Sequence, residues 1–320
     1  MPLRQVYPDP SANPSDTPSA QVDIIAVHGL NPYSKDEEVH GFDTWRAPDG
    51  PTGRLWLSAD LPQVAPKARV FLFIYDSSVV YGKDRSTFVD KANDLLETIR
   101  LERRGAEKRP IIFLGHSMGG LLIKQALIQA HSNLKYTPIK EATSGLAFFA
   151  TPHRGGGENL VALGGTAARM ALLLGFQKGD NVVETLEKGS IFSDIMQDSW
   201  KQQLLQYEIV SFWGSLDNIV PRESARFGLP GEKENIVTLK ADHSGVCKFG
   251  DSQADKDNLK KVEGNIQDLY ETALKQGELL SLPAAQEPAS RGNTYSSQGD
   301  LWLGNQFNAG NGINFNYGRR

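Results

Sequence analysis

The chain has 320 residues, of which 39% are hydrophobic and 22% are charged, and its formal net charge is −4. This hydrophobic fraction suffices for a sizeable core and excludes a wholly disordered protein. The slightly acidic balance, without a basic stripe, argues against nucleic-acid binding. The single cysteine, Cys247, excludes an intramolecular disulfide and fits a reducing compartment.

The N-terminal segment, residues 1–20, has five prolines and no apolar core. We expect a flexible leader there rather than a secretory signal. The longest apolar stretch, Met170–Phe176, is too short to cross a bilayer. A cytoplasmic, soluble protein is therefore the expectation.

Residues 21–277 alternate short apolar runs with helical patterns, which predicts an α/β domain with a mostly parallel, doubly wound sheet. The expected strands are Val22–His28, Ala68–Tyr75, Arg109–His116, Ser144–Thr151, Gln206–Gly214 and Asn235–Lys240. The expected helices are Ser86–Arg104, Met118–Ser132 and Asp255–Leu274. An insert at about 158–200 contains further helical patterns, and its length suggests a cap over the carboxyl edge of the sheet.

The C-terminal segment differs in composition from this domain. Residues 278–292 read as a linker, and residues 293–320 are rich in asparagine, glycine and aromatic residues. Such a tract cannot build a globular core, but asparagine ladders and stacked aromatics suit a cross-β assembly. Composition alone leaves two readings open, a polar tail without function and an amyloid-forming motif.

A serine lies at a sharp turn between a strand and a helix. The apolar run Ile111–Leu114 leads into Gly115–Gly119, and a helical pattern over Leu121–Leu127 leads out. Ser117 stands at the apex of this G-x-S-x-G pattern. Strand, turn and helix in this order form the context of a nucleophile elbow, in which small neighbours relieve the strained turn.

A serine hydroxyl becomes a nucleophile when an imidazole accepts its proton and a carboxylate orients that imidazole. Asp217 follows one predicted strand and His243 follows the next, so the order Ser, Asp, His is that of α/β-hydrolases. All three side chains should emerge at the same edge of the sheet. Asp242 and Asp76 are rival acids, and Asp217 is the preferred one.

The tetrahedral intermediate of acyl transfer needs backbone N–H donors. One should come from Met118, directly after the nucleophile. The other should come from the loop that ends the first core strand, and Leu30 is the expected donor because Gly29 allows a close approach.

Other candidate residues receive structural interpretations. His153 lies in a glycine-rich loop at the same edge, where it could touch a substrate, although a structural role is favoured. His116 should pack inside the elbow, and Cys247 should be inert. Leu121 and Leu122 stand where a P-loop needs Lys and Ser/Thr, and the histidines lack metal-ligand spacing. We therefore expect neither a cofactor nor a metal.

Five segments carry a resemblance over roughly residues 20–275: VDIIAVHGLN, FLGHSMGG, FFATPHRGG, WGSLDNIVP and DHSGVCKF. They resemble the serine esterase/lipase-like α/β-hydrolase domain at the N-terminus of fungal NLR-type receptors, which is related to serine active-site-containing lipase-like proteins. By matching position, the resemblance implies the triad Ser117, Asp217 and His243. It also implies Leu30 and Met118 as oxyanion donors.

The tail is similar to the amyloid signalling motifs, notably the sigma type, of fungal cell-death effectors. This resemblance implies a serine ester hydrolase that is activated when an NLR-type receptor templates an amyloid fold on residues 293–320. The implied partners are an acyl-ester or lipid substrate, the receptor and further copies of the tail, without nucleic acid or a transmembrane segment. Peripheral membrane contact, a non-catalytic amyloid adaptor, and a peptidase or acyltransferase with the same triad stay open as alternatives.

Overall fold

The computed structural model describes residues 2–12, 19–31, 36–153, 160–173, 176–188, 192, 203–229 and 231–281. These residues belong to one compact unit, Met1–Leu282. The expected amyloid motif at 293–320 lies outside the described residues.

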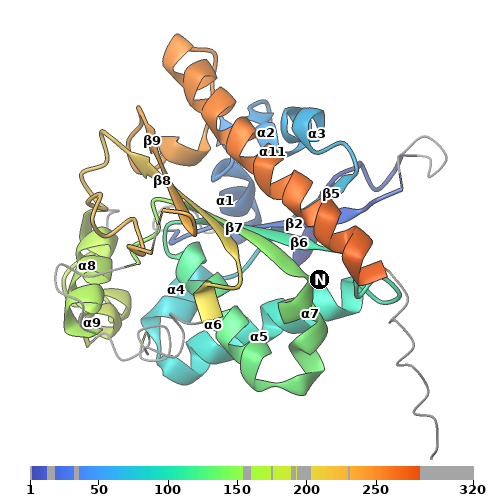
Figure 1. Ribbon diagram of the computed structural model, residues 1–320. Coiled ribbons are helices and arrows are strands. Elements are labelled where there is room, and N and C mark those ends of the chain that lie inside the picture. The colour runs from blue at the N-terminus through green and yellow to red at the C-terminus, as the bar shows by residue number, and fades with distance from the viewer. Residues whose placement is uncertain are drawn as a thin grey trace, which may run out of the picture. The chain divides into compact units, whose positions relative to one another are not determined.

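Within the described residues, seven strands form one sheet in the order β1-β5-β2-β6-β7-β8-β9 (Figure 1). They are β1 (Leu3–Tyr7), β2 (Val22–Val27), β5 (Ala68–Phe73), β6 (Ile111–His116), β7 (Thr143–Phe149), β8 (Glu208–Gly214) and β9 (Glu234–Leu239). Strand β1 pairs antiparallel with β5, and every other neighbouring pair is parallel. A short hairpin, β3 (Arg46–Ala47) and β4 (Arg54–Leu55), stands apart from this sheet.

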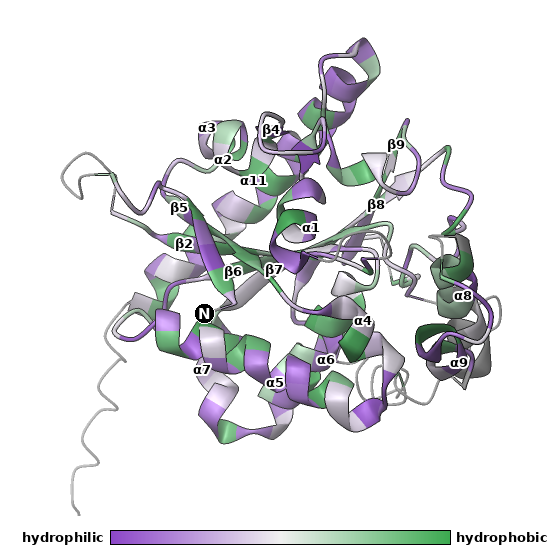
Figure 2. Cartoon of the chain, turned by 180° about the vertical axis from the view of Figure 1, so that it is seen from behind, coloured by the Kyte–Doolittle hydropathy of each residue, from purple (hydrophilic) through white to green (hydrophobic). Residues whose placement is uncertain are grey.

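Helices cover both faces of the sheet. They are α1 (Glu37–Asp43), α2 (Trp56–Ala59), α3 (Leu61–Val64), α4 (Ser77–Gly82), α5 (Arg85–Glu102), α6 (Gly119–Ser132), α7 (Thr137–Ala142), α8 (Leu160–Leu173), α9 (Asn181–Lys188) and α11 (Gln253–Ser281), with 3-10 turns η2 (Leu134–Tyr136) and η5 (Gly245–Cys247). Helices α4 to α7 lie against one face, and α2, α3 and α11 lie against the other (Figure 1). Green and purple alternate along α5 and α11 in Figure 2, as expected for helices that bury one side on a sheet.

Two hydrophobic cores result from the alternation of side chains along the strands. On β6, Ile111 and Phe113 belong to the core under α4 to α7, whereas Ile112 and Leu114 belong to the core under α11. Successive side chains of a strand point to opposite faces, so an apolar run supplies both cores at once. This is why the central strands contain so few polar residues.

The chain order reverses beside β2, because β5 lies on one side of it and β6 on the other. In such sheets ligands bind at the carboxyl ends of the strands, next to this reversal. A mostly parallel, doubly wound sheet with a serine turn after β6 is the α/β-hydrolase fold, which confirms the predicted fold class.

The expected leader is wrong in part. Residues 3–7 form β1, which lies at the edge of the sheet and pairs with β5. Leu3 is buried in the core, so a few apolar side chains at an open sheet edge outweigh the proline-rich surroundings. The expected linker also begins too early, because α11 continues to Ser281.

The insert between β7 and β8 contains α8 and α9. Met170 of α8 and Val182 and Leu186 of α9 are buried in the same core as α4 to α7. Val182 lies so close to Gly82 at the end of α4 that a Cβ on this glycine would be 3.0 Å from it. The insert is thus packed onto the domain through α4, and its predicted role as a cap stays a prediction.

Candidate active site

The backbone at Ser117 has a φ of 53°, in the left-handed region that few residues other than glycine adopt. Its N–H donates to the carbonyl of Phe149 on the neighbouring strand at 2.8 Å, which holds the strained residue in place. The next turn leaves no room for side chains, because a Cβ on Gly119 would lie 2.2 Å from the carbonyl oxygen of His28. The glycines of the motif are therefore required by contact, as the sequence predicted.

The structure brings Ser117, His243 and Asp217 together. His243 Nε2 lies 3.0 Å from Ser117 Oγ, and His243 Nδ1 lies 2.9 Å from Asp217 Oδ2. A carboxylate accepts, so Nδ1 carries the proton, and Nε2 is left to accept the serine hydroxyl. All three residues are buried, and Ser117 is only 1% exposed.

The loops after β8 and β9 position the acid and the histidine. The N–H of Leu216 donates to the carbonyl of Ala241 at 3.0 Å, which ties one loop to the other. Asp217 Oδ1 accepts the N–H groups of Ile219 and Val220 at 2.7 and 3.0 Å. Its carboxylate is thus fixed by its own turn, and Oδ2 remains directed at the imidazole.

The rival acids, Asp242 and Asp76, accept hydrogen bonds from nearby backbone N–H groups. Asp242 accepts the N–H of Gly245 at 2.8 Å, and Asp76 accepts the N–H of Val79 at the start of α4, also at 2.8 Å. Both are turn or cap interactions. Neither acid takes the place that Asp217 occupies.

His116, expected only to pack, also contacts the backbone of His243. Its Nε2 lies 3.0 Å from the backbone carbonyl of His243. Burial, followed by the nearby His243, lowers the pKa of His116 well below its usual value, so the ring is neutral and Nε2–H donates. The ring inside the elbow therefore anchors the His243 backbone, a role for which the sequence held no signal beyond proximity to Ser117.

The loop after β2 lies directly against Ser117. A Cβ on Gly29 would lie 2.8 Å from Ser117 Cβ and 3.2 Å from its Oγ. His28 Nδ1 donates to the carbonyl of Gly29 at 2.9 Å, while His28 Nε2 accepts the N–H of Tyr75 at 3.3 Å. Burial lowers the pKa of His28 to about 3, so this neutral tautomer persists.

This bond orients the next amide. In a trans peptide the C=O and the N–H point in opposite directions. Because the carbonyl of Gly29 faces the His28 ring, the N–H of Leu30 faces away from that ring. Leu30 and Met118, the two predicted oxyanion donors, are both buried. Met118 directly follows Ser117, and Leu30 directly follows Gly29, which lies against Ser117.

His153 lies among aromatic side chains. Its ring centroid is 3.7 Å from that of Phe227, in a stacked arrangement, and 4.7 Å from that of Phe148. The residue is 3% exposed, as a structural histidine would be. The glycine-rich residues 154–159 after it lie outside the described residues, and a contact of His153 with substrate stays a prediction.

Cys247 lies in a different setting from Ser117. Burial raises the pKa of Cys247 to about 12, so its thiol stays protonated. Among the described residues, no cluster of three or more His, Cys, Asp or Glu side chains is arranged to hold a metal ion. Within the described ranges, no helix is both long and apolar enough for a membrane span.

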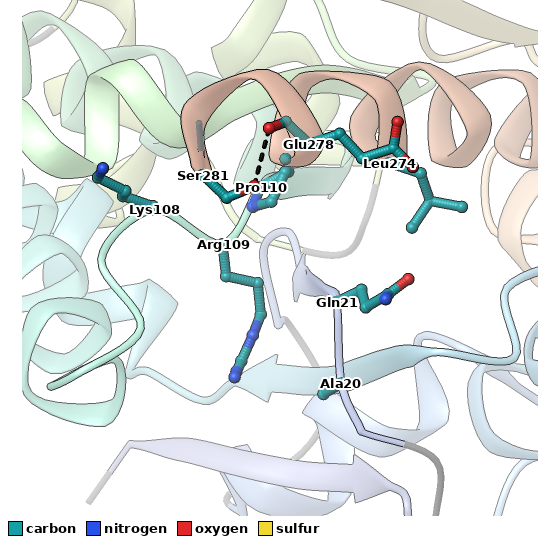
Figure 3. Close-up of a pocket in the computed structure, with 9 residues that line it drawn as sticks. Ala20, Gln21, Lys108, Arg109, Pro110, Leu274, Glu278 and Ser281 are labelled. Carbon is teal, nitrogen blue, oxygen red and sulfur yellow. Dashed lines mark hydrogen bonds between the residues drawn. The ribbon is translucent and has the colours of Figure 1, made fainter. Parts of the chain in front are cut away.

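A pocket of about 290 Å³ lies away from this site (Figure 3). It is lined by Ala20, Gln21, Lys108, Arg109, Pro110, Leu274, Gly277, Glu278 and Ser281. Gln21 and Pro110 precede β2 and β6, so the pocket opens at the amino edge of the sheet, whereas Ser117 follows β6 at the carboxyl edge. Arg109 is paired with the buried Asp23 at 3.3 Å, which gives it a structural role.

Comparisons with known proteins find similarities at low sequence identity. No protein-family model matches the chain. It is similar to Protein SERAC1 from Homo sapiens, with 24% identity over 261 residues, and from Mus musculus, with 25% identity over 261 residues. The aligned part is 71% of this chain and 36% of either protein, so the chain spans little more than a third of the curated relatives it matches.

Among solved structures, the chain resembles Bacillus licheniformis lipase BlEst2, with 17% identity, a TM-score of 0.49, and coverage of 83% of this chain and 97% of that one. It also resembles BorB, a type II thioesterase from the borrelidin biosynthetic cluster, with 18% identity, a TM-score of 0.43, and coverage of 84% and 97%. The fungal-receptor and amyloid parts of the expected resemblance stay predictions. The chain is similar to SERAC1 at low identity, and its own sheet order is that of an α/β-hydrolase.

Proposed function

We propose that the chain is a serine hydrolase that cleaves carboxylic ester bonds through an acyl-enzyme, with Ser117, His243 and Asp217 as its triad. The observation that carries this proposal is the buried hydrogen-bond chain from Ser117 Oγ through the imidazole to Asp217 Oδ2. The left-handed φ of Ser117 supports it, since nucleophile elbows hold their serine in such a strained turn.

In the first half-reaction, Ser117 Oγ attacks the ester carbonyl carbon while His243 Nε2 takes the hydroxyl proton. The carbonyl oxygen becomes an oxyanion that the N–H groups of Leu30 and Met118 stabilise, by roughly 3–4 kcal/mol for each donor. The imidazolium then gives its proton to the departing alcohol. In the second half, water repeats the same steps on the acyl-serine and releases the acid.

The triad specifies acyl transfer and leaves the acyl donor open. An ester or lipid substrate is our proposal, while a peptidase or an acyltransferase would use the same three residues. A screen across acyl chain lengths, phospholipids, peptides and competing alcohols separates these activities. Product partitioning toward an added alcohol would indicate acyl transfer.

Labelling with a fluorophosphonate probe tests the nucleophile. We expect the probe to label the chain and to fail on Ser117→Ala. Ser215→Ala is the matched control, because Ser215 is an exposed serine beside the Asp217 loop at the same edge of the sheet. Equal labelling of Ser117→Ala and the parent chain would refute the proposal.

For the cellular role, we propose a cytoplasmic cell-death effector whose tail, residues 293–320, is templated into amyloid by an NLR-type receptor. The asparagine, glycine and aromatic content of the tail supports it. If cell death is unchanged in Ser117→Ala but is lost in a chain that lacks residues 293–320, the protein would be a non-catalytic adaptor instead. If the chain that lacks these residues causes cell death at the full rate, the amyloid role is excluded.

A further inference from the structure

The proposed oxyanion site has two arms: the loop after β2, which carries the N–H of Leu30, and the start of α6, which carries the N–H of Met118. Two buried tyrosines of one segment contact both arms. Tyr75 follows β5, and Tyr81 lies in α4 six residues later. The hydroxyl of Tyr75 donates to the carbonyl of His28 at 2.9 Å. The hydroxyl of Tyr81 donates to the carbonyl of Met118 at 2.6 Å. Neither tyrosine belongs to the proposed triad.

Tyr75 holds the first arm by three contacts with a single residue. Its ring stacks on the His28 ring with centroids 4.4 Å apart, its N–H donates to His28 Nε2, and its hydroxyl donates to the His28 carbonyl. His28 in turn donates to the carbonyl of Gly29, which sets the direction of the Leu30 N–H. Tyr75 thereby controls both the tautomer and the position of the histidine that orients this donor.

Tyr81 holds the second arm at the start of α6. The carbonyl of Met118 already accepts the N–H groups of Leu121 and Leu122 at 3.0 and 3.3 Å. The tyrosine bond, at 2.6 Å, is shorter than either. It restrains rotation of Met118 about its Cα and so fixes the direction of the Met118 N–H.

The two hydroxyl groups also lie next to each other. Tyr75 and Tyr81 bring their oxygens within 3.5 Å of each other. Each hydroxyl has one proton, and the shorter distances assign both protons to the carbonyls. Burial raises the pKa of both phenols, so both hydroxyls stay protonated donors.

We propose that Tyr75 and Tyr81 are positioning residues that set the spacing of the two oxyanion donors, Leu30 N–H and Met118 N–H. This inference rests on the proposed serine hydrolase function. Stabilisation of an oxyanion depends on donors that are already in place when charge develops. The segment that contains Tyr75 and Tyr81 holds both arms in place and so supplies this preorganisation.

The alternative is that buried hydroxyls merely find the nearest acceptor, as they generally do. The variants Tyr75→Phe and Tyr81→Phe remove one oxygen each and keep the rings. Tyr207→Phe is the matched control, because Tyr207 is a buried tyrosine bonded to His131 at 2.9 Å. His131 stands twelve residues along α6 from Gly119, about 18 Å away at 1.5 Å per residue.

We would measure kcat and KM on a short p-nitrophenyl ester, inhibition by a trifluoromethyl ketone, and thermal unfolding. The ketone adds to the serine and carries an oxyanion, so it reports on the donors directly. We expect Tyr75→Phe and Tyr81→Phe each to lower kcat about tenfold at unchanged KM and to weaken the ketone by the same factor. The double variant should lose less than the product of the two, because both act on one arrangement.

Tyr207→Phe should affect unfolding alone. A lower melting temperature of Tyr81→Phe with unchanged kcat and ketone inhibition would overturn the inference. If Tyr81→Phe does not fold, the same result for Tyr75→Phe would overturn it. A parent chain that neither turns over esters nor reacts with fluorophosphonate would instead refute the proposed function. The two failures are therefore distinguishable.

Discussion

At the scale of single residues, the proposed site depends on which acid faces His243. Asp217 Oδ2 lies 2.9 Å from the imidazole, whereas the neighbouring Asp242 binds the N–H of Gly245. The acid next to the histidine in sequence is thus not its partner in space. Asp242 and His243 are consecutive residues, and the side chains of consecutive loop residues point in different directions.

Replacing Asp217 by asparagine keeps the shape of the side chain and favours the wrong imidazole tautomer. We expect kcat to fall by roughly 10⁴-fold, as in other triads, with a small change in thermal stability. Asp242→Asn is the control and should leave kcat nearly unchanged. Ester hydrolysis at saturating substrate measures both, and equal losses would contradict the assignment of the acid.

A second residue-scale prediction concerns Lys124, which is 2% exposed on α6. Burial lowers the pKa of its amine to about 7 from the ordinary 10.5. The Phe227 ring, 4.9 Å from Nζ, favours the charged form, and a desolvated contact of this kind contributes about 2 kcal/mol, less than the free energy that corresponds to the lowered pKa. Between pH 7 and 10.5 the unfolded chain therefore binds a proton that the folded chain lacks.

The free energy of unfolding should accordingly rise with pH through this window and lose that contribution as the pH falls toward 7. Lys124→Met should remove this part of the pH dependence. Urea unfolding at pH 6.5 and 9.5 measures it, with Lys260→Met, an exposed change on α11, as control. A parallel pH dependence of Lys124→Met and the parent chain would count against the lowered pKa.

At the scale of elements, the turn between β6 and α6 depends on close backbone contact. Gly119→Ala would place its Cβ 2.2 Å from the His28 carbonyl oxygen, a backbone atom that cannot move aside cheaply. We expect the free energy of unfolding to fall by about 3 kcal/mol or more, the upper end for overpacking. Chemical denaturation measures this change.

The control lies in another helix. Gly264 of α11 is exposed, and a Cβ there meets no atom within 4 Å. Gly264→Ala should raise stability by up to about 1 kcal/mol, from helix propensity alone. Similar effects of the two alanines would mean that β6 and α6 are not packed against β2 as described.

At the scale of the whole molecule, the compact unit ends at Leu282. A chain that stops there should keep the melting temperature and the fluorophosphonate reactivity of the full chain, because the triad and both cores lie within it. It should also lose any capacity to form thioflavin-positive fibrils, since residues 293–320 carry the cross-β composition. Fibrils from the truncated chain would contradict the second expectation.

The sequence by itself determined the central strands and the long helices, and it singled out Ser117, Asp217 and His243, which the fold brings within hydrogen-bond distance of one another. Apolar runs and helical periodicity are local signals, and parallel strands place their carboxyl ends at one edge whatever the details of packing. Short elements gave no such signal. Strand β1 and helix α4 have five and six residues, too few for a period to emerge from their composition.

Only the tertiary structure decided what supports the site. His116 meets the backbone of His243 across 127 positions, and Tyr81 meets Met118 across 37. These contacts join a side chain to a carbonyl, and every residue has a carbonyl, so no residue type marks the partner. The candidate site could be recognised from residue types in the sequence. The contacts that hold its residues in position depend on packing that only the folded chain defines.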